Sequence, residues 1–238
     1  MTRKFIKNLF IVEGSTDKDF MEKFIKLFIA KEKLNISDDF YIVKKIHKDG
    51  GKIHFFQIGA ENIITHIEEN SDDENLPKTF LIVDADWEAH HIEHQPAGYS
   101  NVSKALEVIK NKIKDHSFIQ SHSAFKQFEI DHFIMPFNKE TQEYGELETL
   151  FINALKPQYR NKLNCLDALE DCLKQNAPKP NIQSHHKDKM RMEILLKSYG
   201  YKTMDKAIEW IDYDSEILQD LKDFLRKKLT KTKSKNKK

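Results

Sequence analysis

The sequence of 238 residues has little of what defines several structural classes. Its 2 Cys, 7 Gly and 6 Pro exclude a disulfide-rich scaffold, a collagen-like chain and a low-complexity protein. No stretch approaches the roughly 18 uncharged apolar residues of a membrane helix, and the N-terminal residues lack the apolar run of a secretion signal. We therefore expect a cytoplasmic protein without a membrane partner, long enough to bury a real core.

The two cysteines agree with a reducing compartment. Cys165 and Cys172 are seven residues apart in a segment with helical spacing, which places them about 10.5 Å apart along the helix. That separation is beyond the reach of a disulfide bond. We interpret both as structural thiols.

The sequence also has almost no net charge, because 39 basic residues face 38 acidic ones. Residues 226–238 nevertheless hold eight basic residues and no acidic one, leaving 31 basic against 38 acidic residues before them. A run of like charges repels itself and stays solvated. We predict a disordered basic extension whose Lys231, Lys233 and Lys235 contact nucleic acid phosphates; the alternative is a tail that only aids solubility.

Apolar runs and helical periodicity alternate along the first two thirds of the chain. Residues 8–12, 40–46 and 79–83 have the pattern of strands, and residues 16–33 and 102–114 that of helices. This alternation predicts an α/β fold with a mainly parallel sheet flanked by helices. Later segments look helical throughout (161–174, 187–199, 204–210 and 215–228). We predict an α/β core over residues 1–155, a helical C-terminal portion packed on it over 156–228, and the basic tail over 229–238.

Two of the apolar strands run directly into carboxylates. Val12 is followed by Glu13, and Val83 by Asp84, with Asp86 two residues further on the same face. Ligands of open parallel sheets bind at the carboxyl ends of the strands, and clustered carboxylates there favour a hard cation, Mg²⁺ or Mn²⁺. Since the chain has no glycine-rich phosphate loop and no serine or cysteine nucleophile motif, metal-assisted phosphate chemistry is the class that the residues favour.

The same residues resemble Toprim domains. Leu9 to Asp17 is similar to the first Toprim motif, an apolar strand followed by Glu-Gly-x-x-Asp, and Leu81 to Asp86 to the second, Asp-x-Asp. The resemblance covers residues 8 to about 115. It implies that Asp84 and Asp86 hold one or two Mg²⁺ ions, that Glu13 completes the site or acts as general acid or base, and that Asp17 contributes.

A narrower resemblance extends to about residue 228. Residues 134–136, 145–150, 187–196 and 207–210 resemble a Toprim-related bacterial family of unknown function. In the overcoming-lysogenisation-defect nucleases, more distant relatives within Toprim, a later acidic residue and a C-terminal lysine join the metal site. By that resemblance Glu148 would fill the first place, and Lys187 or Lys189 the second.

Three functions follow from these observations. The leading one is a Mg²⁺-dependent nuclease acting on DNA or RNA phosphodiesters. The second is a Toprim-like module that binds nucleic acid or a nucleotide, or regulates a partner, without turnover. The third is a phosphatase of the haloacid-dehalogenase type, disfavoured by Trp87 and Glu88 after the Asp-x-Asp.

A histidine group follows the second motif. His90, His91 and His94 could bind a transition metal such as Zn²⁺, or lie in a surface loop, which is the reading that we favour. The oligomeric state is left open.

Overall fold

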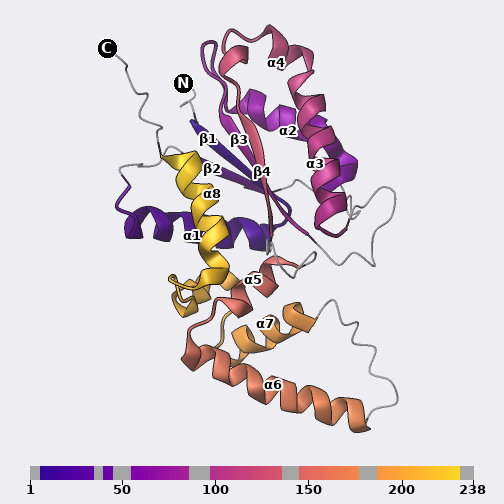
Figure 1. Cartoon of the computed structure of the whole chain (residues 1–238), viewed down its shortest axis with the longest axis vertical. Coiled ribbons are helices and arrows are strands. Elements are labelled where there is room, and N and C mark those ends of the chain that lie inside the picture. The colour runs from indigo at the N-terminus through magenta and orange to yellow at the C-terminus, as the bar shows by residue number, and fades with distance from the viewer. Residues whose placement is uncertain are drawn as a thin grey trace.

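The chain forms an α/β structure in the computed structural model, which describes residues 6–34, 40–44, 55–85, 97–135, 145–176 and 187–230 (Figure 1). The sheet and the elements between its strands come first: β1 (Asn8–Val12), α1 (Ser15–Lys31), β2 (Phe40–Lys44), α2 (Phe55–Glu69), β3 (Lys78–Asp84), α3 (Tyr99–Lys114), α4 (Ser117–Ser121), the 3₁₀ turn η2 (Phe125–Gln127) and β4 (Ile130–Met135). The remainder is helical: α5 (Leu147–Asn153), α6 (Pro157–Asn176), α7 (Lys187–Ser198), the 3₁₀ segments η4 (Met204–Trp210) and η5 (Glu216–Leu218), and α8 (Gln219–Leu229).

The four strands form one sheet in the order β2-β1-β3-β4, and each neighbouring pair is parallel. Each connection between parallel strands must cross a face of the sheet, and α1, α2 and α3 lie in these connections. The predicted α/β fold, a parallel sheet flanked by helices with a helical C-terminal part, is confirmed. All four strands end at the same edge, and Figure 1 shows α5 and α7 beyond that edge.

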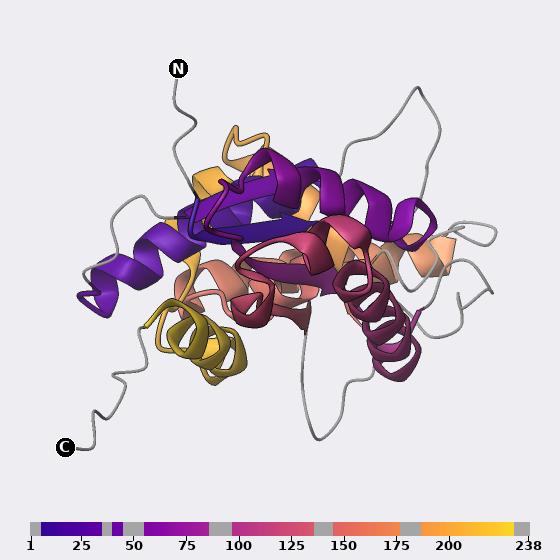
Figure 2. The same ribbon diagram turned by 90° about the horizontal axis from the view of Figure 1, so that it is seen from above.

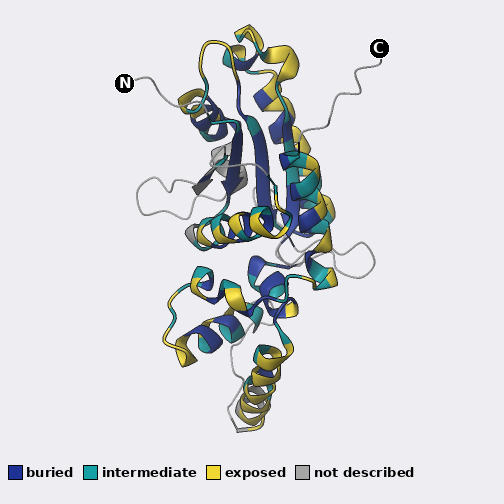
Figure 3. Ribbon diagram, turned by 90° about the vertical axis from the view of Figure 1, so that its left-hand side faces the viewer, coloured by how far each residue is buried: buried dark blue, intermediate teal, exposed yellow. Residues whose placement is uncertain are grey.

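Side chains alternate between two hydrophobic layers, one on each face of the sheet. Phe10 and Phe80 point into a cluster with α1, α5 and α8, whereas Leu9 and Leu81 point into a second cluster with α2, α3 and α4. Figure 2 shows helices on both sides of the strands, and Figure 3 shows the strands buried between them. The continuous apolar runs of β1 and β3 are thus explained, because strands covered on both faces need apolar side chains at every position.

The C-terminal helix α8 belongs to the first of these layers. Its Phe224 ring lies 5.4 Å from the ring of Phe133 and 6.0 Å from that of Phe80, and Arg226 donates from Nη2 to Oε1 of Glu32 at 3.0 Å. The helix continues to Leu229, which is buried. The first basic residues of the charged C-terminal run therefore belong to the helix expected over residues 215–228, because α8 buries an apolar face and Arg226 is held by an ion pair.

Several boundaries differ from those expected. Helix α6 begins at Pro157, four residues before the predicted start, since proline is well tolerated at the first helical position. Residues 204–210 form a 3₁₀ segment instead of an α-helix. Cys165 and Cys172 are exposed on α6 and are not joined in a disulfide, as their spacing predicts. None of the helices in the described ranges is both long and apolar enough to cross a membrane.

Candidate functional site at the carboxyl edge of the sheet

The turn between β1 and α1 presents two of the predicted acidic residues. Glu13 directly follows β1 and is half-buried. The backbone N–H of Gly14 donates to Oδ2 of Asp17 at 2.7 Å, so Asp17 caps the start of α1, where a negative charge also meets the positive end of the helix dipole. A Cβ atom on residue 14 would lie 3.0 Å from the same carboxylate oxygen. Glycine therefore allows this tight turn.

Strand β3 delivers Asp84 to the same edge. Val12 of β1 is paired with Ile82 of β3, so Glu13 and Asp84 lie one and two residues beyond that pair on neighbouring strands. Phe80 and Ile82 face the layer that contains α1 and α5, and strand alternation puts Asp84 on that face as well. Its Oδ1 atom is buried.

The first turns of α5 and α7, two helices from the C-terminal half of the chain, lie at the same edge. Glu146 precedes α5 as its N-cap residue, and Glu148 lies in the first turn. Helix α7 begins at Lys187 and carries Asp188 and Lys189 in its first turn, and α5 packs against α7. The fold thus brings α5 and α7, which lie more than 100 residues after β1 and α1 in the sequence, to the same edge as those two elements.

The electrostatic coupling of Lys189 shows which of these side chains share a region. Partial desolvation alone would lower its pKa, but the carboxylates of Glu148, Glu146, Asp84 and Asp17 outweigh that effect and raise the pKa. These four acids come from α5, the residue before it, β3 and α1. The predicted residues Asp17, Asp84 and Glu148 therefore all lie within electrostatic range of Lys189.

Glu148 shows that negative charge exceeds positive charge here. Burial raises its pKa, and although Lys189 acts in the opposite direction, Asp17 and Asp188 raise it further. A carboxyl group in such surroundings holds its proton at higher pH than an exposed glutamate. The site thus combines a carboxyl group and a lysine whose pKa values are both raised.

The remaining predicted residues either lie at the same edge or fall outside the described ranges. Helix α7 begins at Lys187, so both candidate lysines are at the edge, but the electrostatic coupling described above concerns Lys189. Other predicted residues lie outside the described ranges: Asp86, His90, His91, His94, Lys231, Lys233 and Lys235. Within those ranges, no three His, Cys, Asp or Glu side chains are grouped closely enough to hold a metal ion. A complete metal site would therefore need a further ligand, and Asp86 directly follows the last residue described after β3.

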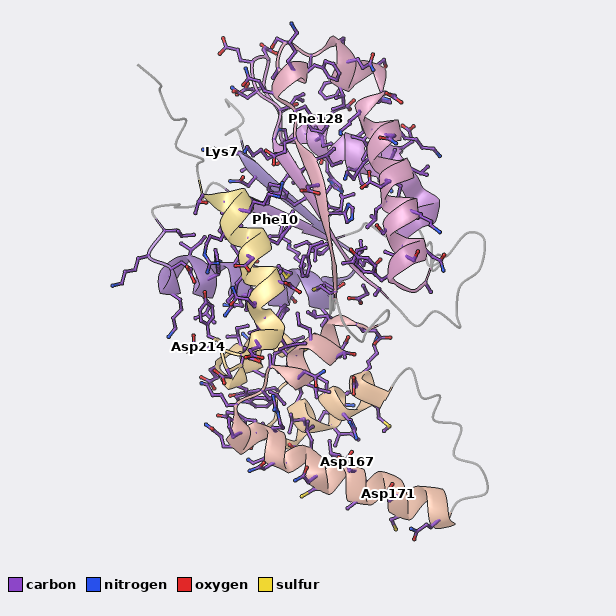
Figure 4. The ribbon with its side chains drawn as sticks, in the orientation of Figure 1. Lys7, Phe10, Phe128, Asp167, Asp171 and Asp214 are labelled. Carbon is purple, nitrogen blue, oxygen red and sulfur yellow. The ribbon has the colours of Figure 1, made fainter. Side chains whose placement is uncertain are left out.

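Sequence reasoning missed Glu146 and Asp188. Both are coupled to the predicted residues, Glu146 through Lys189 and Asp188 through Glu148. The signal was weak, since each is an ordinary acidic residue at a helix start. Acidic residues elsewhere do not belong to this group: Figure 4 shows Asp167 and Asp171 on α6, the helix farthest from the strands.

Comparison with known proteins agrees with part of these expectations. No curated protein and no solved structure matches the chain. A family model matches residues 7–230, from the residue before β1 to the residue after α8. This confirms the predicted membership of a family of unknown function. The chain belongs to the family of proteins of unknown function named DUF3226.

Proposed function

We propose that this protein is a metal-dependent enzyme that hydrolyses nucleic acid phosphodiesters, with its active site at the carboxyl edge of the sheet. The observation that carries the proposal is the convergence of Asp17, Asp84 and Glu148 on Lys189 from four separate elements. Glu146, directly before α5, acts on the same lysine. Carboxylates gathered at this edge of a parallel sheet are typical of a cation-binding site.

The residues divide into binding and proton-transfer roles. Asp84 and Asp86 would hold Mg²⁺, with Asp17 nearby, and Glu13 would complete the ligand set or act as general acid or base. When bound, the cation would stabilise charge on the phosphate oxygens and favour ionisation of an attacking water. Lys189 would neutralise a phosphate oxygen, and Glu148 can carry a proton to the leaving oxygen because its pKa is raised by burial.

The resemblance to Toprim domains supports the same assignment. The two motif acids Glu13 and Asp84 directly follow β1 or end β3, which are adjacent parallel strands. The later acid and lysine that the overcoming-lysogenisation-defect nucleases add are matched by Glu148 and Lys189. Asp86 belongs to the proposal through its place in the Asp-x-Asp motif.

The test is a cleavage assay on plasmid, single-stranded DNA, RNA and p-nitrophenyl phosphate, each with Mg²⁺, Mn²⁺ or a chelator. We expect cleavage of nucleic acid that requires the metal and is lost in Glu13→Gln and Asp84→Asn. Glu68→Gln is the matched control, because Glu68 is an exposed carboxylate on α2 and not part of the site. Cleavage that persists in Asp84→Asn would contradict the site, and turnover of p-nitrophenyl phosphate alone would favour a phosphatase.

A binding module without turnover is the second candidate. It is favoured by the finding that the described residues alone contain no group of three metal ligands. Under this alternative the chain binds nucleic acid or a nucleotide but leaves every substrate intact with either metal. Isothermal titration with Mg²⁺ or Mn²⁺ alone then separates a site that binds metal from one that does not.

A further inference from the structure

Helix α7, which carries Lys189, lies between α5 and α6 and contacts both of them (Figure 1). Its buried face includes Met192, Leu195 and Leu196, which are at most 6% exposed and belong to the hydrophobic layer that contains α1 and α5. Apolar contacts are not directional, whereas an arginine–carboxylate pair adds geometric specificity to a contact. The charged residues beside the buried face therefore define the rotation of α7 about its own axis most sharply.

Arg191 makes polar contacts on one side of this buried face. Its guanidinium forms an ion pair with Asp167 of α6 through Nη2, and its Nη1 atom lies 3.8 Å from Oδ1 of Asp188 in the first turn of α7. The side chain of Arg191 is largely buried, at 16% exposure. Asp167 lies one helical turn after the buried Leu163 of α6 and so shares its face. Arg191 thus connects the start of α7 to α6.

Lys189 lies on the other side of the same buried face. Successive residues of an α-helix are rotated by about 100°, which puts Lys189 and Arg191 roughly 160° apart around α7, with Met192 between them. Lys189 interacts with the carboxylates of Glu148 and Glu146 at the start of α5, whereas Arg191 contacts α6. The two cations therefore hold α7 from its two sides, and a turn of the helix at one contact moves the other.

The pair of Arg191 and Asp167 is a costly way to join two helices. Desolvation lowers the pKa of Arg191, which shows that the surroundings disfavour its charge. Apolar side chains of similar volume often stabilise such a contact equally well or better. What the charged pair adds is direction, because the planar guanidinium donates its hydrogen bonds in a fixed fork geometry. The pair is therefore suited to fixing the orientation of α7 more than to holding α7 and α6 together.

We propose that Arg191 is a positioning residue: Asp167 holds it from α6, and Arg191 in turn orients the first turn of α7 so that Lys189 faces the carboxylates at the carboxyl edge of the sheet. Arg191 acts through Lys189 and has no part in the chemical step itself. This inference rests on the proposed function for its effect on catalysis. It goes beyond that function by giving α6, a helix outside the site, control over the position of the lysine.

The first test is a double-mutant cycle on metal-dependent cleavage. Arg191→Met removes the ion pair and keeps an apolar side chain, and we expect kcat to fall about 10- to 100-fold, because a misplacement of about 1 Å can cost ~100-fold. In the Lys189→Met background the same substitution should cause no further loss, because its effect passes through the lysine. Lys197→Met, which removes the exposed ion pair with Glu193 on the same helix, is the matched control and should keep the rate. Losses of equal size in both backgrounds, or a similar loss in the control, would overturn the positioning role.

The second test follows Lys189 in chelator and needs no cleavage. The carboxylates raise the pKa of Lys189, and NMR titration of ¹³C-labelled lysine side chains measures it, with the signal assigned by its loss in Lys189→Met. We expect this pKa to fall in Arg191→Met and in the milder Asp167→Asn, and to stay unchanged in Lys197→Met. An unchanged pKa in both of the first two variants would overturn the positioning role even if their melting temperatures fall, since a purely structural ion pair affects stability alone.

The two tests also separate this inference from the proposed function. A protein that shows the pKa shifts of Lys189 but cleaves no substrate refutes the proposed nuclease and keeps the positioning role of Arg191. Metal-dependent cleavage that is lost in Asp84→Asn but is unaffected by Arg191→Met does the reverse.

Discussion

Two charged regions of the molecule show opposite behaviour. Along β4, acids and bases are matched by short contacts: Lys228 lies 2.9 Å from Glu129 and 2.7 Å from Asp131, and Lys78 lies 2.9 Å from Glu129. At the carboxyl edge of the sheet, several carboxylates share Lys189. The first arrangement holds α8 against the sheet, whereas in the second one lysine interacts with carboxylates from three separate parts of the chain.

The pKa values report the same contrast. Burial would raise the pKa of Asp131, but Lys228 and Lys110 outweigh it, and the pKa falls below its ordinary value. For Glu148, burial raises the pKa and one lysine does not reverse it. A carboxylate that is paired with cations in a folded protein is stabilised in its charged form, while burial favours the neutral form. Carboxyl groups with pKa values raised by burial are enriched at functional sites.

Replacing one acid from each region should give the largest difference between the regions in cleavage rate and thermal stability. We expect Asp84→Asn to reduce metal-dependent cleavage by about 100-fold or more, because it removes the proposed cation ligand on β3, and to change the melting temperature less than Asp131→Asn does. Asp131→Asn should keep the cleavage rate and lower the melting temperature, because it removes a partner of Lys228. Parallel cleavage and thermal unfolding assays measure both, and loss of activity in Asp131→Asn would break the comparison.

The ammonium of Lys228 should contribute more to stability than any single charge at the carboxyl edge. Lys228→Met keeps the apolar stem but leaves Glu129 and Asp131 without it. We expect the free energy of unfolding to fall by about 1–3 kcal/mol, less than the ~3–5 kcal/mol for a fully buried pair, because both carboxylates are about one third exposed. Urea denaturation checks this, with the exposed neighbour Lys227→Met as control. Equal losses in the two variants would refute the role of the pair.

The two regions should also respond to pH with opposite signs. The folded pKa of Glu148 lies above its ordinary 4.5, so the wild-type protein loses stability as pH rises through that range. Glu148→Gln should match wild type in acid and be more stable near pH 7. The folded pKa of Asp131 lies below 3.8, so its contribution is present above that pH and is lost in acid.

Urea denaturation in chelator from about pH 3 to pH 7 tests both of these pH dependences. Asp131→Asn should be less stable than wild type near neutral pH and approach it in acid, whereas the advantage of Glu148→Gln should grow as pH rises. Both effects should be smaller than that of Lys228→Met. If Glu148→Gln were less stable than wild type at neutral pH, the carboxylate of Glu148 would be paired with a cation, as that of Asp131 is.

The sheet and the positions of Glu13 and Asp84 could be predicted because both depend on local signals. A strand buried on both faces has a continuous apolar run, as in residues 9–12 of β1 and 80–83 of β3, and the acid at the carboxyl end of such a run must lie at the sheet edge. The couplings of Glu146 with Lys189 and of Asp188 with Glu148 could not be predicted, because they arise only when α5 packs against α7.

The place of α8 was also beyond local reasoning. Its sequence predicts an amphipathic helix with a basic end, but nothing in that pattern says that Phe224 covers Phe80 of β3. Charge runs suggest solvation when they are read alone. Arg226 and Lys228 show the opposite outcome, because acids from α1 and the start of β4 lie within reach in the folded chain.

Removing only the residues beyond 230 should have the smallest effect on stability, and a second, longer truncation separates the charge of the tail from the packing of α8. Removing residues 231–238 deletes five lysines and leaves Leu229, which is 6% exposed. We expect unchanged thermal stability and weaker nucleic acid binding at low salt, with the salt slope reduced by up to about 3.5 if every lysine contacts a phosphate of a single strand. Removing residues 229–238 deletes Leu229 as well and should cost about 1.5–3 kcal/mol of stability. The two truncated proteins differ by the buried Leu229 and the partly buried Thr230. Equal stability of the two would show that Leu229 does not contribute to the packing of α8. Unchanged affinity in the shorter deletion would leave strand binding to the folded part of the chain.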